Sequence, residues 1–226
     1  MSRDDLLSIN GKIVTEVCEN LKRVAPEAMI IMVSNPLDVT TYLAGEVFGA
    51  ARERIMGMAG GLDTARYQTF IAWEVGCAPY EVEAVLLGGH GDSMVPLPRL
   101  TAVNGVALDE LLSAEKIAAI VQRTRQGGAE IVSHLKTGSA FYAPAAAVAD
   151  MVQAIARDEH RIIPCCVRLE GEYGLRDVFL GVPCRLGRAG VEEVVELYLN
   201  EEESAALAES AAQVRATVAA WEQLRA

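Results

Sequence analysis

The stretch AMIIMVSNP, residues 28–36, decides the fold of this chain. A run of six residues that is apolar on both faces is typical of a strand buried in a parallel sheet. The proline that ends the stretch suits the first turn of a helix, and Val39, Leu43 and Val47 then recur at helical spacing. A buried strand leading into a helix predicts an open α/β sheet, in which ligands bind at the carboxyl ends of the strands. Asn35 would lie at that end.

The pattern extends outward from this strand in both directions. Apolar residues at helical spacing over 6–21 predict a preceding helix, and residues 54–58 predict a further strand. After residue 58 the pattern becomes mixed: it predicts strands over 81–87, 97–103, 162–169 and 178–186, and helices over 60–75, 113–135, 143–155 and from 200 onward. We therefore expect an α/β region over 1–58 and an α+β region over 59–226.

Composition limits the classes of function. The 226 residues carry a net charge of −11, with 51% hydrophobic residues, which excludes a disordered or low-complexity chain. An acidic chain without a basic cluster predicts neither nucleic acid nor an anionic membrane as partner. We find no apolar run of about 18 residues and no layout of a signal peptide. Five cysteines without C-x-x-C spacing indicate a reduced, cytoplasmic chain without a disulfide framework.

Three residues are candidates for chemistry. His90 lies in Gly-Gly-His-Gly-Asp-Ser, residues 88–93, at the end of a predicted strand. A lone histidine in a loop is often structural, but glycines on both sides allow close approach of a ligand. Asp63 and Arg66 share one face of a predicted helix. They form either a surface ion pair, or a carboxylate that orients a base beside a guanidinium that grips a substrate carboxylate. No second histidine or cysteine has ligand spacing, so we predict no metal.

Four segments together resemble the lactate/malate dehydrogenase family: MSRDDLL at 1–7, VSNPLD at 33–38, GLDTAR at 61–66 and GGHGDS at 88–93. The similarity runs from the first residue to the last helix. The sequence GGHGDSMVP at 88–96, together with SAFYAP at 139–144, most resembles the bacterial malate dehydrogenases of this family that are similar to lactate dehydrogenase in fold. Lactate members usually carry an acidic residue where Gly89 stands.

The resemblance implies NAD-dependent oxidation of malate to oxaloacetate by hydride transfer. In that reaction His90 would accept the proton of the C2 hydroxyl, and Asp63 would hold the other ring nitrogen. Arg66 would clamp the C1 carboxylate of the substrate, and Arg3 would polarise its carbonyl from a closing loop. Asn35 would contact both substrate and nicotinamide.

The resemblance also implies where NAD binds. Asn10 and the backbone of Val33 and Ser34 would border the cofactor, with Asn35. Residues 1–58 would be the C-terminal remnant of a Rossmann domain with a doubly wound parallel sheet, followed by an α+β substrate domain over 59–226. The first Rossmann half, with the glycine-rich turn for the pyrophosphate, has no counterpart in this sequence. We therefore expect an N-terminally truncated chain that binds NAD weakly.

Two other interpretations stay open. The chain could be an inactive module that depends on oligomer contacts, or a lactate-type 2-hydroxy acid dehydrogenase. In the favoured interpretation the partners are a small-molecule substrate, malate or oxaloacetate, and further copies of the chain in a dimer or tetramer.

Overall fold

The strand predicted at 28–33 is β1 (Ile30–Met32), and it lies between α1 (Arg3–Val24) and α2 (Leu37–Phe48). Our computed structural model describes residues 3–225 of the chain. β2 (Ile55–Gly57) runs parallel to β1, with Ile30 opposite Ile55. The helix, strand, helix and strand predicted over the first 58 residues are therefore confirmed, with β1 shorter than its apolar run.

One mixed sheet runs through most of the molecule. Its strand order is β1-β2-β8-β9-β4-β5, with β10 paired to β9. β2 joins β8 in antiparallel fashion at the single pair Gly57 and Cys166. The sheet thus crosses the expected boundary after residue 58, and the division into two domains stays a prediction. The bounds of the later strands are β4 (Leu86–Gly88), β5 (Met94–Pro96), β8 (Arg161–Glu170), β9 (Arg176–Gly187) and β10 (Gly190–Val194).

A small second sheet departs from the predictions. It contains β3 (Val82–Glu83), β6 (Ala102–Val103) and β7 (Val106–Ala107). The strand predicted over 81–87 is split between the two sheets, as β3 and β4. The strand predicted over 97–103 is wrong for most of its length, because Pro98–Leu100 form the short 3-10 helix η3. A proline cannot donate to a strand ladder, which favours the helical turn there.

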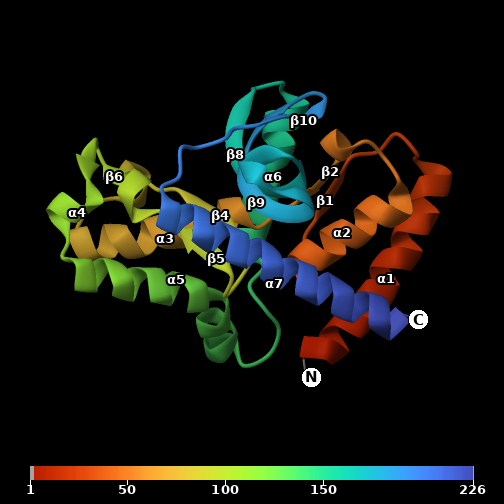
Figure 1. Ribbon diagram of the computed structural model, residues 1–226, viewed down its shortest axis with the longest axis horizontal. Helices are drawn as coiled ribbons and strands as arrows, with labels where there is room; N and C mark the ends of the chain where they lie inside the picture. The colour runs from red at the N-terminus through yellow and green to blue at the C-terminus, as the bar shows by residue number, and fades with distance from the viewer. Residues whose placement is uncertain (1–2, 226) are drawn as a thin grey trace.

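The last helix, α7 (Glu201–Arg225), crosses the molecule from β4 and β5 to α1 (Figure 1). Four of its apolar side chains, Leu207, Ala211, Val214 and Trp221, are buried, and Val218 is partly buried. A Cβ at Gly11 of α1 would overlap the Trp221 ring. The ring of Trp221 in α7 therefore packs directly against the backbone of α1 at Gly11. The other helices are α3 (Gly60–Val75), α4 (Leu108–Leu111), α5 (Ala114–Leu135) and α6 (Tyr142–Ala156). Within residues 3–225, no helix has the length and apolar character that spanning a membrane requires.

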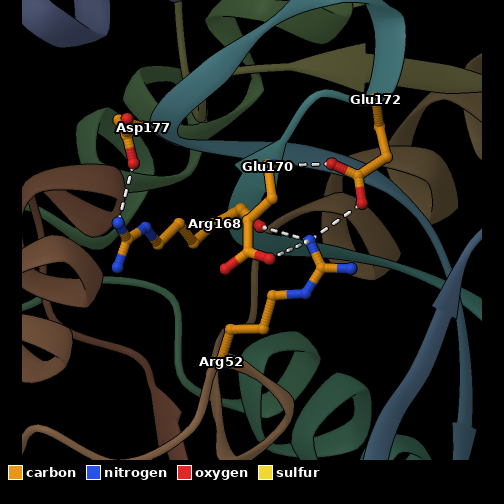
Figure 2. A network of polar contacts seen from close by, with 5 residues as sticks. All are labelled: Arg52, Arg168, Glu170, Glu172 and Asp177. Carbon is orange, nitrogen blue, oxygen red and sulfur yellow. Dashed lines mark hydrogen bonds and ion pairs between the residues drawn. The ribbon is translucent and has the colours of Figure 1, made fainter.

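A polar network ties the short helix η1 (Arg52–Arg54) to the turn between β8 and β9 (Figure 2). Arg52 Nη1 lies 2.8 Å from Glu172 Oε1 and 3.7 Å from Glu170 Oε2, and it donates to the Arg168 carbonyl at 3.4 Å. The Glu170 N–H donates to Glu172 Oε2 at 2.6 Å. Beside it, Arg168 Nη2 donates to Asp177 Oδ1 at 2.7 Å. The network gives the junction between β2 and β8 a second attachment.

Candidate active site

The structure brings together the three residues that the sequence singled out. His90 lies in the loop between β4 and β5, and its Nδ1 lies 2.7 Å from Asp63 Oδ2. The other oxygen of Asp63 accepts from Arg66 Nη1 at 3.1 Å. The Asp63 side chain is only 1% exposed. The interpretation as a surface ion pair is therefore wrong, and the carboxylate is a buried bridge between an imidazole and a guanidinium.

The start of α3 explains the position of Asp63 and Arg66. A Cβ at Gly60 would lie 2.8 Å from the Pro164 carbonyl oxygen, so only glycine lets α3 begin this close to β8. Asp63 lies in the first turn of α3, where a carboxylate interacts favourably with the helix dipole. Arg66 follows on the same face and is largely buried.

The loop that carries His90 is held from two sides. Gly88 and Gly91 have φ values of 91° and 89°, which side chains rarely adopt. The Gly89 N–H donates to Ser210 Oγ of α7 at 2.9 Å. The His90 N–H donates to Asp38 Oδ2 of α2 at 2.9 Å. The backbone around His90 is thus fixed by side chains from two separate helices.

The environment raises the pKa of His90 above its ordinary value. Burial lowers this pKa, but the charge of Asp63 and its hydrogen bond more than offset that effect. The charge of Asp38 raises the pKa further, and Arg66 lowers it. Asp63 occupies Nδ1, so Nε2 is the ring nitrogen that remains for proton exchange with a ligand.

His90, Arg66 and Asp38 line a cavity of about 740 Å³, a size typical of sites for small molecules and cofactors. Arg66 and Arg125 supply positive charge to its lining, and Asn35 and Pro36 line it from the carboxyl end of β1. Arg66 Nε is buried and has no hydrogen-bond partner among the residues that the structure describes. A buried N–H without a partner is costly, so this atom favours an anionic ligand.

The residues expected to border a cofactor lie together beside this cavity. Asn10 Nδ2 of α1 donates to the Asn35 carbonyl at 2.6 Å. Val33, Ser34 and Asn35 follow β1 and are exposed. Their predicted roles stay predictions. Arg3 is the first residue of α1, but its side chain lies outside the described part of the chain.

Three further residues of the site were missed by sequence reasoning. Asp38 and Ser210 hold the His90 loop, and Arg125 lines the cavity while donating to the Met94 carbonyl at 3.2 Å. Asp38 stands within the recognised segment 33–38, but nothing in the spacing relates it to His90. Ser210 and Arg125 belong to ordinary amphipathic helices, so no sequence signal distinguishes them.

One cluster in the described chain has the spacing of metal ligands: Asp158, His160 and Glu192. None of the three lines the cavity. Glu192 Oε2 lies 2.7 Å from His160 Nδ1, and the Arg188 N–H donates to Asp158 Oδ1 at 2.7 Å. These atoms already have partners, and the prediction that no metal binds stays a prediction.

Comparison with known proteins agrees with the geometry. Residues 1–57 match the NAD binding domain of lactate/malate dehydrogenase, and residues 61–224 match its alpha/beta C-terminal domain. The malate dehydrogenase of Roseiflexus castenholzii is 52% identical over 224 residues, which cover 99% of this chain and 72% of that protein.

Solved structures show the same likeness. Malate dehydrogenase from Salinibacter ruber superimposes with a TM-score of 0.95 at 49% identity, over 99% of this chain and 73% of its own. Malate dehydrogenase from Plasmodium falciparum in complex with NADH gives a TM-score of 0.93 at 39% identity, over 97% and 74% of the two chains.

Proposed function

Because this chain belongs to the lactate/malate dehydrogenase family, we propose that it interconverts malate and oxaloacetate with NAD and that His90 moves the proton. The observation that carries this proposal is the chain of contacts from His90 through Asp63 to Arg66 at the edge of one cavity. A base, a group that orients it and an anion-binding guanidinium are the protein groups that oxidation of a hydroxy acid requires.

Arg66 binds the substrate in this proposal. Its unpaired Nε and its remaining guanidinium donors can grip a planar carboxylate with two hydrogen bonds. Asp63 keeps the guanidinium in place through Nη1. Substrate bound in this way lies beside His90, since both side chains line the same cavity. Arg3 would contact the reacting carbonyl from its position at the start of α1.

His90 exchanges the proton in this proposal. In malate oxidation its neutral Nε2 accepts the proton of the C2 hydroxyl, and Asp63 stabilises the imidazolium that forms. In oxaloacetate reduction the imidazolium returns that proton to the C2 oxygen. The raised pKa of His90 favours the protonated imidazole, which is the form that donates the proton in oxaloacetate reduction.

The residues present fit the nicotinamide end of NAD. The exposed segment 33–35, the Asn10 side chain and a cavity of about 740 Å³ lie at the carboxyl end of β1, where open α/β sheets bind ligands. Asn10, Val33, Ser34 and Asn35 would hold it there. The bound cofactor supplies the hydride acceptor or donor, and the chain supplies orientation and charge.

The test is oxidation of NADH by this chain, followed at 340 nm with oxaloacetate or pyruvate at a millimolar cofactor concentration. We expect turnover with oxaloacetate to exceed turnover with pyruvate. His90→Asn should lower kcat by about 10²- to 10⁴-fold, the range typical of a lost general acid or base. His134→Asn is the matched control, because that exposed histidine lies at the end of α5.

Each other outcome contradicts part of the proposal. A preference for pyruvate would favour a lactate-type enzyme. The absence of any reaction that depends on oxaloacetate would favour an inactive module. Near-normal kcat in His90→Asn would remove His90 from its role.

We further propose that the chain works in the cytoplasm as a homo-oligomer. The five free cysteines support a reducing compartment. Exposed apolar side chains on α1 and α3, among them Ile13 and Trp73, support self-association. Sedimentation analysis of the purified chain tests the second point, and a concentration-independent monomer would refute it.

A further inference from the structure

Asp38 is a buried carboxylate beside the active-site histidine that the reaction described above does not use. Its side chain lies in the first turn of α2 and is 7% exposed. Oδ2 accepts the backbone N–H of His90 at 2.9 Å. Oδ1 is buried and has no hydrogen-bond partner among the described residues. A buried carboxylate with one unpaired oxygen is costly, so its presence calls for a role.

The packing around Asp38 fixes its direction. A Cβ at Gly89 would lie 3.2 Å from Asp38 Oδ2 and 2.9 Å from Val214 Cγ2 of α7, so the carboxylate and the His90 loop are in close contact. The Cys166 thiol of β8 interacts with the Asp38 side chain. The carboxylate is therefore enclosed by α2, β8 and the loop, and its oxygen is directed at the backbone of His90.

We propose that Asp38 is a positioning residue for His90, which holds the imidazole in place through the backbone N–H and supplies a second negative charge to the imidazolium. This inference rests on the proposed role of His90 as the group that carries the substrate proton. Asp63 fixes one ring nitrogen from α3, and Asp38 fixes the backbone of the same residue from α2. Two buried carboxylates from different helices thus contact His90, one at its ring and one at its backbone.

The charged groups that face His90 are Asp63 and Arg66 from α3 and Asp38 from α2. The two carboxylates raise the pKa of His90 against the effects of burial and of Arg66. Burial raises the pKa of Asp38, whereas the His90 N–H, the charge of His90 and Cys166 lower it. Burial is the largest of these effects, so the pKa of Asp38 lies above its ordinary value, while the charges of Asp38 and His90 favour each other.

The test is an NMR titration of the ring carbons of the three histidines, without substrate. The His90 signal is assigned by its loss in His90→Gln. Asp38→Asn keeps an oxygen that can accept the His90 N–H and removes the charge. We expect the protonation constant of His90 to fall about threefold or more in Asp38→Asn. Asp92→Asn is the matched control, since it removes the same charge from an exposed residue two positions from His90, and its smaller effect is expected from solvent screening.

Unchanged signals of His134 and His160 would report that Asp38→Asn is folded. A His90 titration equal to that of the wild type, or one shifted no more than in Asp92→Asn, would overturn the proposal. A second measurement uses the unsubstituted chain, in case the variant does not fold. The side-chain carboxyl carbon of Asp38 is followed by ¹³C NMR, and we expect it to ionise at a lower pH than His90 titrates. An Asp38 carboxyl that stays protonated while His90 titrates would also overturn it.

This experiment separates the inference from the proposed function. A chain without turnover, in which Asp38→Asn still lowers the His90 protonation constant, would refute the function and keep the coupling. An active chain with an unchanged His90 titration would keep the function and refute the role of Asp38.

Discussion

Replacing Gly11 by alanine tests how α7 is docked on α1. Gly11 lies in the middle of α1, and a Cβ there would overlap the ring of Trp221, which is 4% exposed. Two opposing effects follow. Alanine stabilises a helix interior by about 0.8–1 kcal/mol relative to glycine. A methyl group forced into a filled site destabilises the fold by about 1–3 kcal/mol.

Gly128→Ala isolates the second effect. Gly128 also lies inside a helix, α5, but a Cβ there would meet nothing closer than the Arg66 guanidinium at 3.8 Å. This variant should therefore show only the gain in helix stability. We expect Gly11→Ala to be less stable than Gly128→Ala by about 1–3 kcal/mol. For a chain of this size, each kcal/mol corresponds to about 2–4 °C in Tm.

Urea unfolding followed by tryptophan fluorescence measures the difference. Trp73 is 63% exposed and Trp221 is buried, so a loss of docking should move the emission of Trp221 toward longer wavelength. Equal stabilisation of both variants, with unchanged emission, would refute the close contact between Gly11 and the Trp221 ring. The result bears on function because the neighbouring residue, Asn10, holds the Asn35 carbonyl at the cavity.

Three further predictions concern charges. Asp63→Asn should lower the pKa of His90. The raised pKa contributes stability that is fully present below about pH 6.5 and is lost as pH rises through the folded-state pKa. The urea midpoints of variant and wild type should therefore differ most at acid pH. A constant difference between pH 5 and 9 would contradict this. Arg66→Lys should raise the KM for oxaloacetate about tenfold or more in steady-state assays, because an ammonium cannot bind a carboxylate in bidentate fashion; an unchanged KM would exclude Arg66 from the substrate site. Arg52→Ala should lower the unfolding free energy by about 1 kcal/mol at pH 7 in urea titrations. Burial raises the pKa of Glu172, but the Glu170 N–H and Arg52 lower it more. The stability contributed by the ion pair is therefore lost as pH falls from about 4.5 through the lowered folded-state pKa. An equal loss of unfolding free energy in Arg52→Ala at pH 3 would argue against the ion pair.

Much of the fold could be predicted where the chain's pattern is local. The run at 28–33 and the spacing after Pro36 predicted β1 and α2, and the helix predicted from residue 200 onward is α7. Periodicity reports which face of an element is buried, and these elements are buried as it indicates.

The pairing of β2 with β8 could not be predicted in this way. It depends on one residue pair, Gly57 and Cys166, that no local pattern relates. The strand predicted over 97–103 is wrong for most of its length because Pro98 lacks the N–H that a strand ladder requires, although the segment is largely apolar.

The candidate site shows the same division. Its polar residues were found because His90, Asp63 and Arg66 stand in distinctive segments, and the resemblance connected those segments. Spacing alone did not decide whether Asp63 and Arg66 form a surface ion pair or part of a site. The sequence does not show that Asp63 is buried. Because it is buried, Asp63 connects Arg66 to His90 and holds the imidazole in place. Asp38 was missed because its partner is a backbone N–H, which every residue except proline carries.

The single pair that joins β2 to β8 has a consequence for synthesis. Cys166 leaves the ribosome 109 residues after Gly57. At a synthesis rate of about 5–20 residues per second, roughly 5–20 s pass between the synthesis of β2 and that of the residue in β8 that pairs with it. Throughout that interval the nascent chain presents an unpaired strand edge, which other polypeptides can extend. A chaperone that covers residues 55–57 on the ribosome would protect the chain until β8 emerges.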